Sequence, residues 1–198
     1  MILASASPRR RQLLDDAGIR YTSEAPSVVE LAPPTGDPHA VAALNAARKA
    51  EAIDGELVLG ADTVVAIGPA DGPADGPADG VALGVSQGDE LLGKPRDRDD
   101  ARAMLAKLSG TTHRVVTGVA LKWREQVDVR TEETLVTMRT LTDDELDAYA
   151  DSGEGMGKAG GYAIQETADR FVTRLEGAFD NVVGLPIELV RTLLADHS

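Results

Sequence analysis

Short, almost continuously apolar runs alternate along the chain with segments whose apolar residues repeat at helical spacing. Runs of this kind are typical of strands that are buried on both faces. Strands are predicted over 1–4, 19–23 and 57–67. A helix is predicted over 8–17, because Pro8 suits the first helical position and Gly18 ends the pattern.

A second helix is predicted from Pro38 to about residue 53, with Asp37 as its N-cap. The segment before it, 26–38, is rich in proline and turn-forming residues and is predicted to be a loop that carries Glu30. Arg48 and Lys49 lie in the second half of the helix. Its apolar side is predicted to consist of Val41, Leu44, Ala47 and Ala50.

The second half of the chain repeats this alternation around a hairpin. Helices are predicted over 96–108, from the Thr142–Glu145 capping box to about residue 150, and after residue 186. Two long β-rich runs, 111–123 and 127–139, predict an antiparallel hairpin. Beyond the glycine-rich segment 151–161, we expect strand-like structure at 162–165, a strand at 171–175 and a turn at 181–186.

These elements indicate an α/β fold around a mixed central sheet, bilobed with a cleft between the lobes. The 198 residues suffice for one domain, 1–198. The Gly-Pro-Ala-Asp unit repeats three times from Gly68, and a four-residue repeat of this composition cannot build a core. We therefore assign 68–90 to a low-complexity loop insertion.

Composition narrows the classes of function. The formal charge of −13 argues against partners that are nucleic acids or anionic membranes. The absence of cysteine excludes disulfides and thiolate zinc sites, and suits a reducing compartment. No apolar run approaches the length of a membrane span and no secretory leader is apparent, so a cytoplasmic protein is expected.

The opening turn is a candidate anion site. Small residues lead into a predicted helix N-terminus capped by Ser7, and Arg9, Arg10 and Arg11 follow directly. Free backbone N–H groups beside cations are a common way to bind phosphate. The alternative is that the three arginines form a solvated helix face.

Asp62 is a carboxylate in the middle of an otherwise apolar run, next to Thr63. A buried lone carboxylate is costly, so it should be ion-paired, hydrogen-bonded or bound to a metal. A hydrolase needs such a group as a base for water or as a metal ligand. The structural alternative is a strand-end aspartate that accepts only backbone hydrogen bonds.

Further cations are spread along the sequence at Lys49, Lys94 and Lys158. Each alone is typical of a protein surface, but together with the arginines they provide the several charges that a polyphosphate requires. The three histidines lie in unrelated contexts, and no serine triad or zinc motif is present.

Seven segments taken together resemble the Maf (septum formation inhibitor-like) family of nucleoside triphosphate pyrophosphatases. They are 3–14 (LASASPRRRQLL), 59–65 (LGADTVV), 92–95 (LGKP), 104–110 (MLAKLSG), 116–120 (VTGVA), 158–165 (KAGGYAIQ) and 181–186 (NVVGLP), with His113 between them. The resemblance spans nearly the whole chain in order. It implies a fold similar to that of the inosine triphosphate pyrophosphatases, and hydrolysis of a nucleoside triphosphate to the monophosphate and pyrophosphate with Mg²⁺ or Mn²⁺.

The resemblance also implies roles for individual residues. Asp62 corresponds to the proton acceptor or metal-bound carboxylate, and Glu30 falls where the family often has an acid that assists the metal. The phosphate-binding residues would be Ser7, Arg9, Arg10, Lys49 and Lys94. Arg9, Thr63 and Gln165 match positions tied to base choice. Members of the family often dimerise, so a homodimer is a candidate state.

The Tyr-Ala-Ile-Gln form of residues 162–165 resembles the subfamily that acts on dTTP and UTP, whereas members that prefer 7-methyl-GTP usually diverge there. The chain departs from the family pattern in the Gly-Pro-Ala-Asp insertion, at Gly157 in place of a common acid, and at Glu166 in place of a usual glycine.

Two other classes of function are compatible with the sequence. One is a non-catalytic regulator of cell division that senses a nucleotide through the same site, and only turnover would separate it from the enzyme. The other is a nucleic-acid-binding protein that uses the arginine turn, against which the acidic charge and the 3% aromatic content argue.

Overall fold

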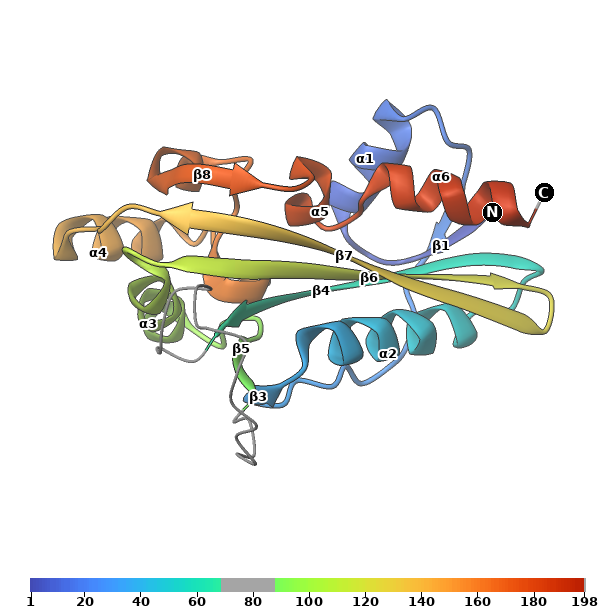
Figure 1. The fold of residues 1–198 in the computed structure, drawn as a ribbon, viewed down its shortest axis with the longest axis horizontal. Helices are drawn as coiled ribbons and strands as arrows, with labels where there is room; N and C mark the ends of the chain where they lie inside the picture. Colours follow the sequence, from blue (N-terminus) through green and yellow to red (C-terminus); the bar gives the residue numbers. More distant parts are fainter. Residues whose placement is uncertain (69–87, 198) are drawn as a thin grey trace, which may run out of the picture.

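The computed structural model describes residues 1–68 and 88–197 (Figure 1). Within these residues eight strands form one mixed sheet, in the order β2-β1-β4-β6-β7-β8, with β5 paired to β4 and β3 paired to β5. The strands are β1 (Ile2–Ala4), β2 (Thr22–Glu24), β3 (Thr35–Gly36), β4 (Leu57–Ile67), β5 (Asp89–Leu92), β6 (Thr112–Trp123), β7 (Gln126–Met138) and β8 (Val172–Glu176). The predicted α/β class and mixed sheet are confirmed.

Strand direction follows from the connections. β1 lies parallel to β2 and to β4, and helices connect these strands along the chain. In the series β4, β6, β7 and β8, each strand is antiparallel to the next. The predicted hairpin is β6–β7 with a turn at Arg124, whose φ of 56° is left-handed. Asp62 lies in the middle of β4, paired in register with Gly118 of β6.

Helices cover both faces of the sheet (Figure 1). They are α1 (Pro8–Asp16), α2 (Pro38–Glu51), α3 (Arg98–Leu108), α4 (Asp143–Ser152), α5 (Phe179–Val183) and α6 (Ile187–Asp196), with 3₁₀ turns η1 (Ala159–Gly161) and η2 (Thr167–Phe171). One face is covered by α2, and the other by α1 and α6, whose leucines share a core with β1, β4 and β6. Predicted caps are present: Ser7 caps α1, and Thr142 and Glu145 form a capping box on α4.

The predicted apolar side of α2 is only partly right. Ala50 is buried and Val41 and Ala47 are partly buried, but Leu44 is exposed. The buried positions are Pro38, Ala42, Asn45, Ala46, Lys49 and Ala50. The reason lies in the sheet beneath, where Gly60 of β4 and Gly118 of β6 let the helix backbone approach directly. A Cβ on Gly60 would lie 2.2 Å from the carbonyl oxygen of Ala46. Alanines therefore pack where the helix backbone lies closest to the sheet, and Leu44 faces outward.

Three further predictions differ from the structure. Residues 162–165 contain no strand; the segment is irregular and runs between η1 and η2, although Tyr162 and Ile164 are buried. Part of the turn predicted at 181–186 is helical, because α5 ends at Val183. Asp89 and Glu90, assigned above to the insertion, belong to β5, and most of the insertion lies outside the described residues.

No helix in residues 1–68 and 88–197 combines the length and apolar character that crossing a membrane would require.

Candidate functional site

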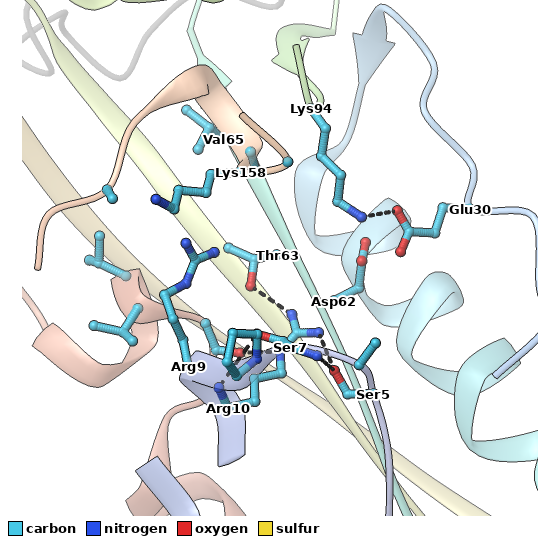
Figure 2. Close-up of a pocket in the computed structure, with 18 of the residues that line it drawn as sticks. Ser5, Ser7, Arg9, Arg10, Glu30, Asp62, Thr63, Val65, Lys94 and Lys158 are labelled. Atoms are coloured by element: carbon cyan, nitrogen blue, oxygen red, sulfur yellow. Dashed lines mark hydrogen bonds and ion pairs between the residues drawn. The ribbon is translucent and has the colours of Figure 1, made fainter. Parts of the chain in front are cut away.

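A pocket of about 580 Å³ opens beside the middle of β4 (Figure 2). Every residue to which the family resemblance assigned a role lines it, and so does Lys158, whereas Arg11 does not. The residues with an assigned role are Ser7, Arg9, Arg10, Glu30, Lys49, Asp62, Thr63, Lys94 and Gln165. They come from the N-terminus of α1, the loop before β3, α2, β4, the segment after β5 and the residues around η1. The structure therefore brings the scattered polar residues of the sequence into one place.

The N-terminus of α1 forms one wall. Ser7 Oγ accepts a hydrogen bond from the backbone N–H of Arg10 at 3.4 Å, and Ser7 N donates to Ser5 Oγ at 3.1 Å. Pro8 has no N–H, and the N–H groups of Ser7, Arg10 and Arg11 are hydrogen-bonded within this turn, so few backbone donors are left for a ligand. The positive end of the helix dipole adds to the attraction for an anion.

Arg10 is fixed in place by the protein. Its Nε donates to the carbonyl of Gly184 at 2.7 Å, and Nη2 donates to Thr63 Oγ1 at 3.2 Å. Burial lowers the pKa of Arg10 from its ordinary value, against the opposing effect of the carboxylates of Asp62 and Glu30. The guanidinium is therefore a preorganised positive charge at the floor of the pocket.

Arg9 is held less completely. Its Nε is buried and has no hydrogen-bond partner among the described residues. Figure 2 shows the guanidinium turned into the pocket, toward Lys158. Burial lowers the pKa of Arg9, and Glu166 opposes this effect. Because a buried unpaired donor is costly, Arg9 is suited to an acceptor supplied by a ligand.

Asp62 is held through both carboxylate oxygens. Lys49 Nζ donates to Oδ1 at 2.6 Å, and Asn45 Nδ2 donates to Oδ2 at 2.8 Å. Lys49 and Asn45 lie one turn apart on the buried side of α2. The carboxylate keeps free lone pairs toward the pocket, because each oxygen can accept more than one hydrogen bond.

Lys49 contacts three acceptors. Besides Asp62, its ammonium lies 2.7 Å from Glu30 Oε1 and 3.3 Å from the carbonyl oxygen of Ala61. An ammonium has three donors, so the hydrogen-bonding capacity of this nearly buried lysine is filled by the protein itself. The lysine thus joins two carboxylates, Asp62 and Glu30.

Glu30 extends this network to the pocket rim. Its Oε2 accepts from Lys94 Nζ at 2.6 Å (Figure 2). Burial disfavours the charged form of Glu30, but hydrogen bonds from Lys49 and Lys94 outweigh it and lower the pKa of Glu30 to about 2. The side chain of Lys94 is about half exposed, at 51%, so it can still reach a ligand.

The segment around η1 forms the opposite wall. Lys158 donates to the carbonyl of Glu154 and, at 3.1 Å, to Glu166 Oε1. Glu166, a departure from the family pattern, thus places a negative charge beside a cation of the pocket. Gln165 lies next to it in the lining.

A buried pair anchors this wall to the sheet. His113 Nε2 of β6 and the hydroxyl of Tyr162 are 2.8 Å apart, and both side chains are almost fully buried. Burial lowers the pKa of His113 to about 4, so the imidazole is neutral near pH 7. Burial also raises the pKa of Tyr162. The sequence motif contained both residues but gave no sign of their contact.

The residues fit a hard divalent cation only in part. The described part of the chain holds no group of three or more side chains that could form a metal centre. Mg²⁺, however, is commonly bound by one or two carboxylates, with substrate phosphates and waters completing its shell. Asp62 and Glu30, joined through Lys49, provide two such carboxylates.

Taken together, the fold and the pocket define a class: an α/β protein whose site combines fixed cations for an anionic ligand with a pair of carboxylates able to do chemistry on it. The chain belongs to the Maf-like protein family, whose model matches residues 1–197.

Curated relatives match nearly the whole chain. A dTTP/UTP pyrophosphatase of Myxococcus xanthus (strain DK1622) is 43% identical over 94% of this chain and 87% of its own length. One of Anaeromyxobacter sp. (strain Fw109-5) is 41% identical over 98% and 87%. One of Syntrophomonas wolfei is also 41% identical, over 98% and 95%.

Proposed function

We propose that this protein hydrolyses nucleoside triphosphates, with dTTP and UTP as preferred substrates, to the monophosphate and pyrophosphate. The observation that carries the proposal is the buried carboxylate of Asp62 facing a pocket of fixed cations. The names of the relatives and the Tyr-Ala-Ile-Gln form of residues 162–165 support the choice of pyrimidine substrates.

The phosphate chain would lie between the N-terminus of α1 and the lysines. At one end it would meet the guanidinium of Arg10, which the protein holds in place, and the unpaired Nε of Arg9 would gain an acceptor. Lys94 and Lys158 are placed to bind the departing pyrophosphate. Lys49 is assigned to Asp62 and Glu30, because its three donors are used within the protein.

Asp62 acts in this proposal as the base. Its carboxylate accepts a proton from a water whose oxygen attacks the α-phosphorus, while the bond from that phosphorus to the α,β-bridging oxygen breaks. The two arginines, Lys94 and Lys158 stabilise the negative charge that develops on the leaving pyrophosphate. Asp62 then returns its proton to solvent.

We also propose that Asp62 and Glu30 hold a divalent cation, Mg²⁺ or Mn²⁺, together with phosphate oxygens of the substrate. When bound, it would supply charge neutralisation on the phosphates and orient the reacting groups. The support is the pair of oxygen-donor side chains at the pocket wall.

Turnover is the decisive test, because a nucleotide-sensing regulator would bind without releasing pyrophosphate. Pyrophosphate release is measured with dTTP, UTP, CTP, GTP and ATP, in Mg²⁺ or Mn²⁺ and after EDTA. We expect dTTP and UTP to be hydrolysed fastest and EDTA to abolish release. Binding of dTTP without any release would favour the regulator.

Asp62→Asn tests the role of the base. It keeps size and removes the proton acceptor, and we expect kcat to fall about 10²- to 10⁴-fold, the usual range for a positioned base. Circular dichroism and dTTP binding serve as controls for folding and for the pocket. A folded variant that binds dTTP and keeps full pyrophosphate release would show that Asp62 is not the base.

A further inference from the structure

Asn45 is a buried polar residue for which no role is predicted from the sequence. It lies on the inner side of α2 with 2% of its surface exposed, where an alanine or leucine would be the ordinary choice. Its amide makes three hydrogen bonds to the protein, and all three involve residues at the pocket wall or next to it. A buried amide with all of these hydrogen bonds formed favours a single arrangement of the groups around it.

Two of these bonds go to the backbone of Leu31. The N–H of Leu31 donates to Asn45 Oδ1 at 2.8 Å, and Asn45 Nδ2 donates to the carbonyl oxygen of Leu31 at 2.9 Å. The side chain therefore pairs with the loop as a neighbouring strand would. Because residues 25–34 have no regular secondary structure, this pair fixes the peptide next to Glu30 on α2.

The third bond goes to Asp62. Asn45 donates to Oδ2 and Lys49 to Oδ1, so two residues one helical turn apart hold both oxygens of the carboxylate. These two hydrogen bonds determine the plane of the carboxylate and therefore the direction of its free lone pairs. Lys49 also contacts Glu30, so the same helical turn holds both acids.

We propose that Asn45 is a positioning residue that aligns the Asp62 carboxylate and ties the loop carrying Glu30 to it. The inference rests on the proposed function, since alignment of Asp62 affects rate only where Asp62 acts on a substrate. A role limited to stability is the competing explanation, because a satisfied buried amide contributes to folding in any protein.

Two variants separate the bonds. Asn45→Leu keeps the volume and removes all three hydrogen bonds. Asn45→Asp keeps an acceptor for the Leu31 N–H, loses the donors to the Leu31 carbonyl oxygen and to Asp62, and places a second carboxyl group beside Asp62. Val190→Ala is the matched control for stability, because Val190 is fully buried on α6, away from the pocket. The variants are compared at temperatures where each is fully folded.

Steady-state kinetics with dTTP give the first readout. We expect kcat to fall about 10²-fold in Asn45→Leu and at least as far in Asn45→Asp, with KM within about threefold, as for a catalytic group displaced by about 1 Å. Val190→Ala should keep kcat within twofold. The proposal is overturned if both Asn45 variants keep kcat within twofold, or if Val190→Ala loses as much activity for a similar loss of stability.

Hydrogen exchange gives a readout that does not depend on turnover. In Asn45→Leu the Leu31 amide should exchange at least tenfold faster than in the wild type, while in Asn45→Asp and Val190→Ala it should stay protected. If the Leu31 amide exchanged at the same rate in Asn45→Leu as in the wild type, the proposal that Asn45 holds the loop on α2 would be overturned. If the wild type released no pyrophosphate from any nucleotide, the proposed function would fail, yet this comparison would still decide whether Asn45 holds the loop.

Discussion

The close contact between α2 and the sheet at Gly60 predicts that adding one methyl group there, in Gly60→Ala, will disturb the geometry of the site, although Gly60 does not line the pocket. A Cβ at Gly60 would lie 2.2 Å from the carbonyl oxygen of Ala46 and 2.7 Å from the backbone nitrogen of Ala50. Ordinary van der Waals contacts of a Cβ begin at 3.4 Å. In Gly60→Ala the helix must therefore move away from β4 by about 1 Å, because the obstacle is backbone on both sides.

This movement acts directly on Asp62, two residues further along β4. The bond from Asn45 to Asp62, now 2.8 Å, would lengthen beyond hydrogen-bond range, whereas the long side chain of Lys49 can follow the carboxylate. We expect the free energy of unfolding to fall by about 2–4 kcal/mol, from overpacking of about 1–3 kcal/mol and about 1 kcal/mol for the lost buried hydrogen bond. We also expect kcat to fall about 10²-fold.

Urea unfolding and steady-state kinetics with dTTP measure both quantities. Gly93→Ala is the control, because an added Cβ there meets only the Ala32 Cβ, at 4.0 Å. Its free energy of unfolding should change by no more than about 1 kcal/mol. If Gly60→Ala were as stable and active as the wild type, α2 would not lie as close to the sheet as the structure places it, and the account of Asp62 would lose its basis.

Two further predictions concern charge. Glu166→Gln removes a carboxylate 3.1 Å from Lys158, so the KM for dTTP should fall about two- to fivefold. Glu176→Gln makes the same change of charge on β8 and should leave KM unchanged. If both variants lowered KM equally, the effect would come from the net charge of the protein and not from Lys158. His113, whose pKa is lowered to about 4 by burial, stays neutral in the native state while the unfolded chain takes up a proton near pH 6.5. The free energy of unfolding should therefore fall as pH drops from about 6.5 to 4. Urea unfolding should show a shallower slope for His113→Gln, and an unchanged slope would contradict this reasoning.

Much of the fold follows from local features of the sequence. The strands β1 and β4 are apolar runs, and α1 and α4 begin at caps whose hydrogen bonds lie within a few residues. The irregular segment 162–165 could not be predicted in this way. Its apolar side chains are as buried as those of a strand, but Tyr162 is held there by a distant histidine, and an apolar run alone does not reveal such a partner.

The sequence predicted which polar residues line the pocket but not which of their side chains bond to one another. Asp62 stood out because a carboxylate in an apolar strand requires a partner, and the cations stood out by their number. Which cation pairs with Asp62 depends on how α2 faces the sheet, and that face could not be inferred from hydrophobic spacing, which favoured Leu44. Glycines in two strands make this contact so close that alanines, rather than Leu44, are buried against the sheet.

The same close contact explains why two polar residues are found on the buried side of a helix. At Gly60 and Gly118 the helix backbone lies on the sheet, so Asn45 and Lys49 on that side reach a strand carboxylate that would otherwise be an isolated buried charge. Breaking such an arrangement by removing one partner costs more than the pair contributes when intact. The glycines that place α2 therefore belong to the site as much as the residues that line it, because the geometry of Asp62 depends on a helix that could not approach if either glycine carried a side chain.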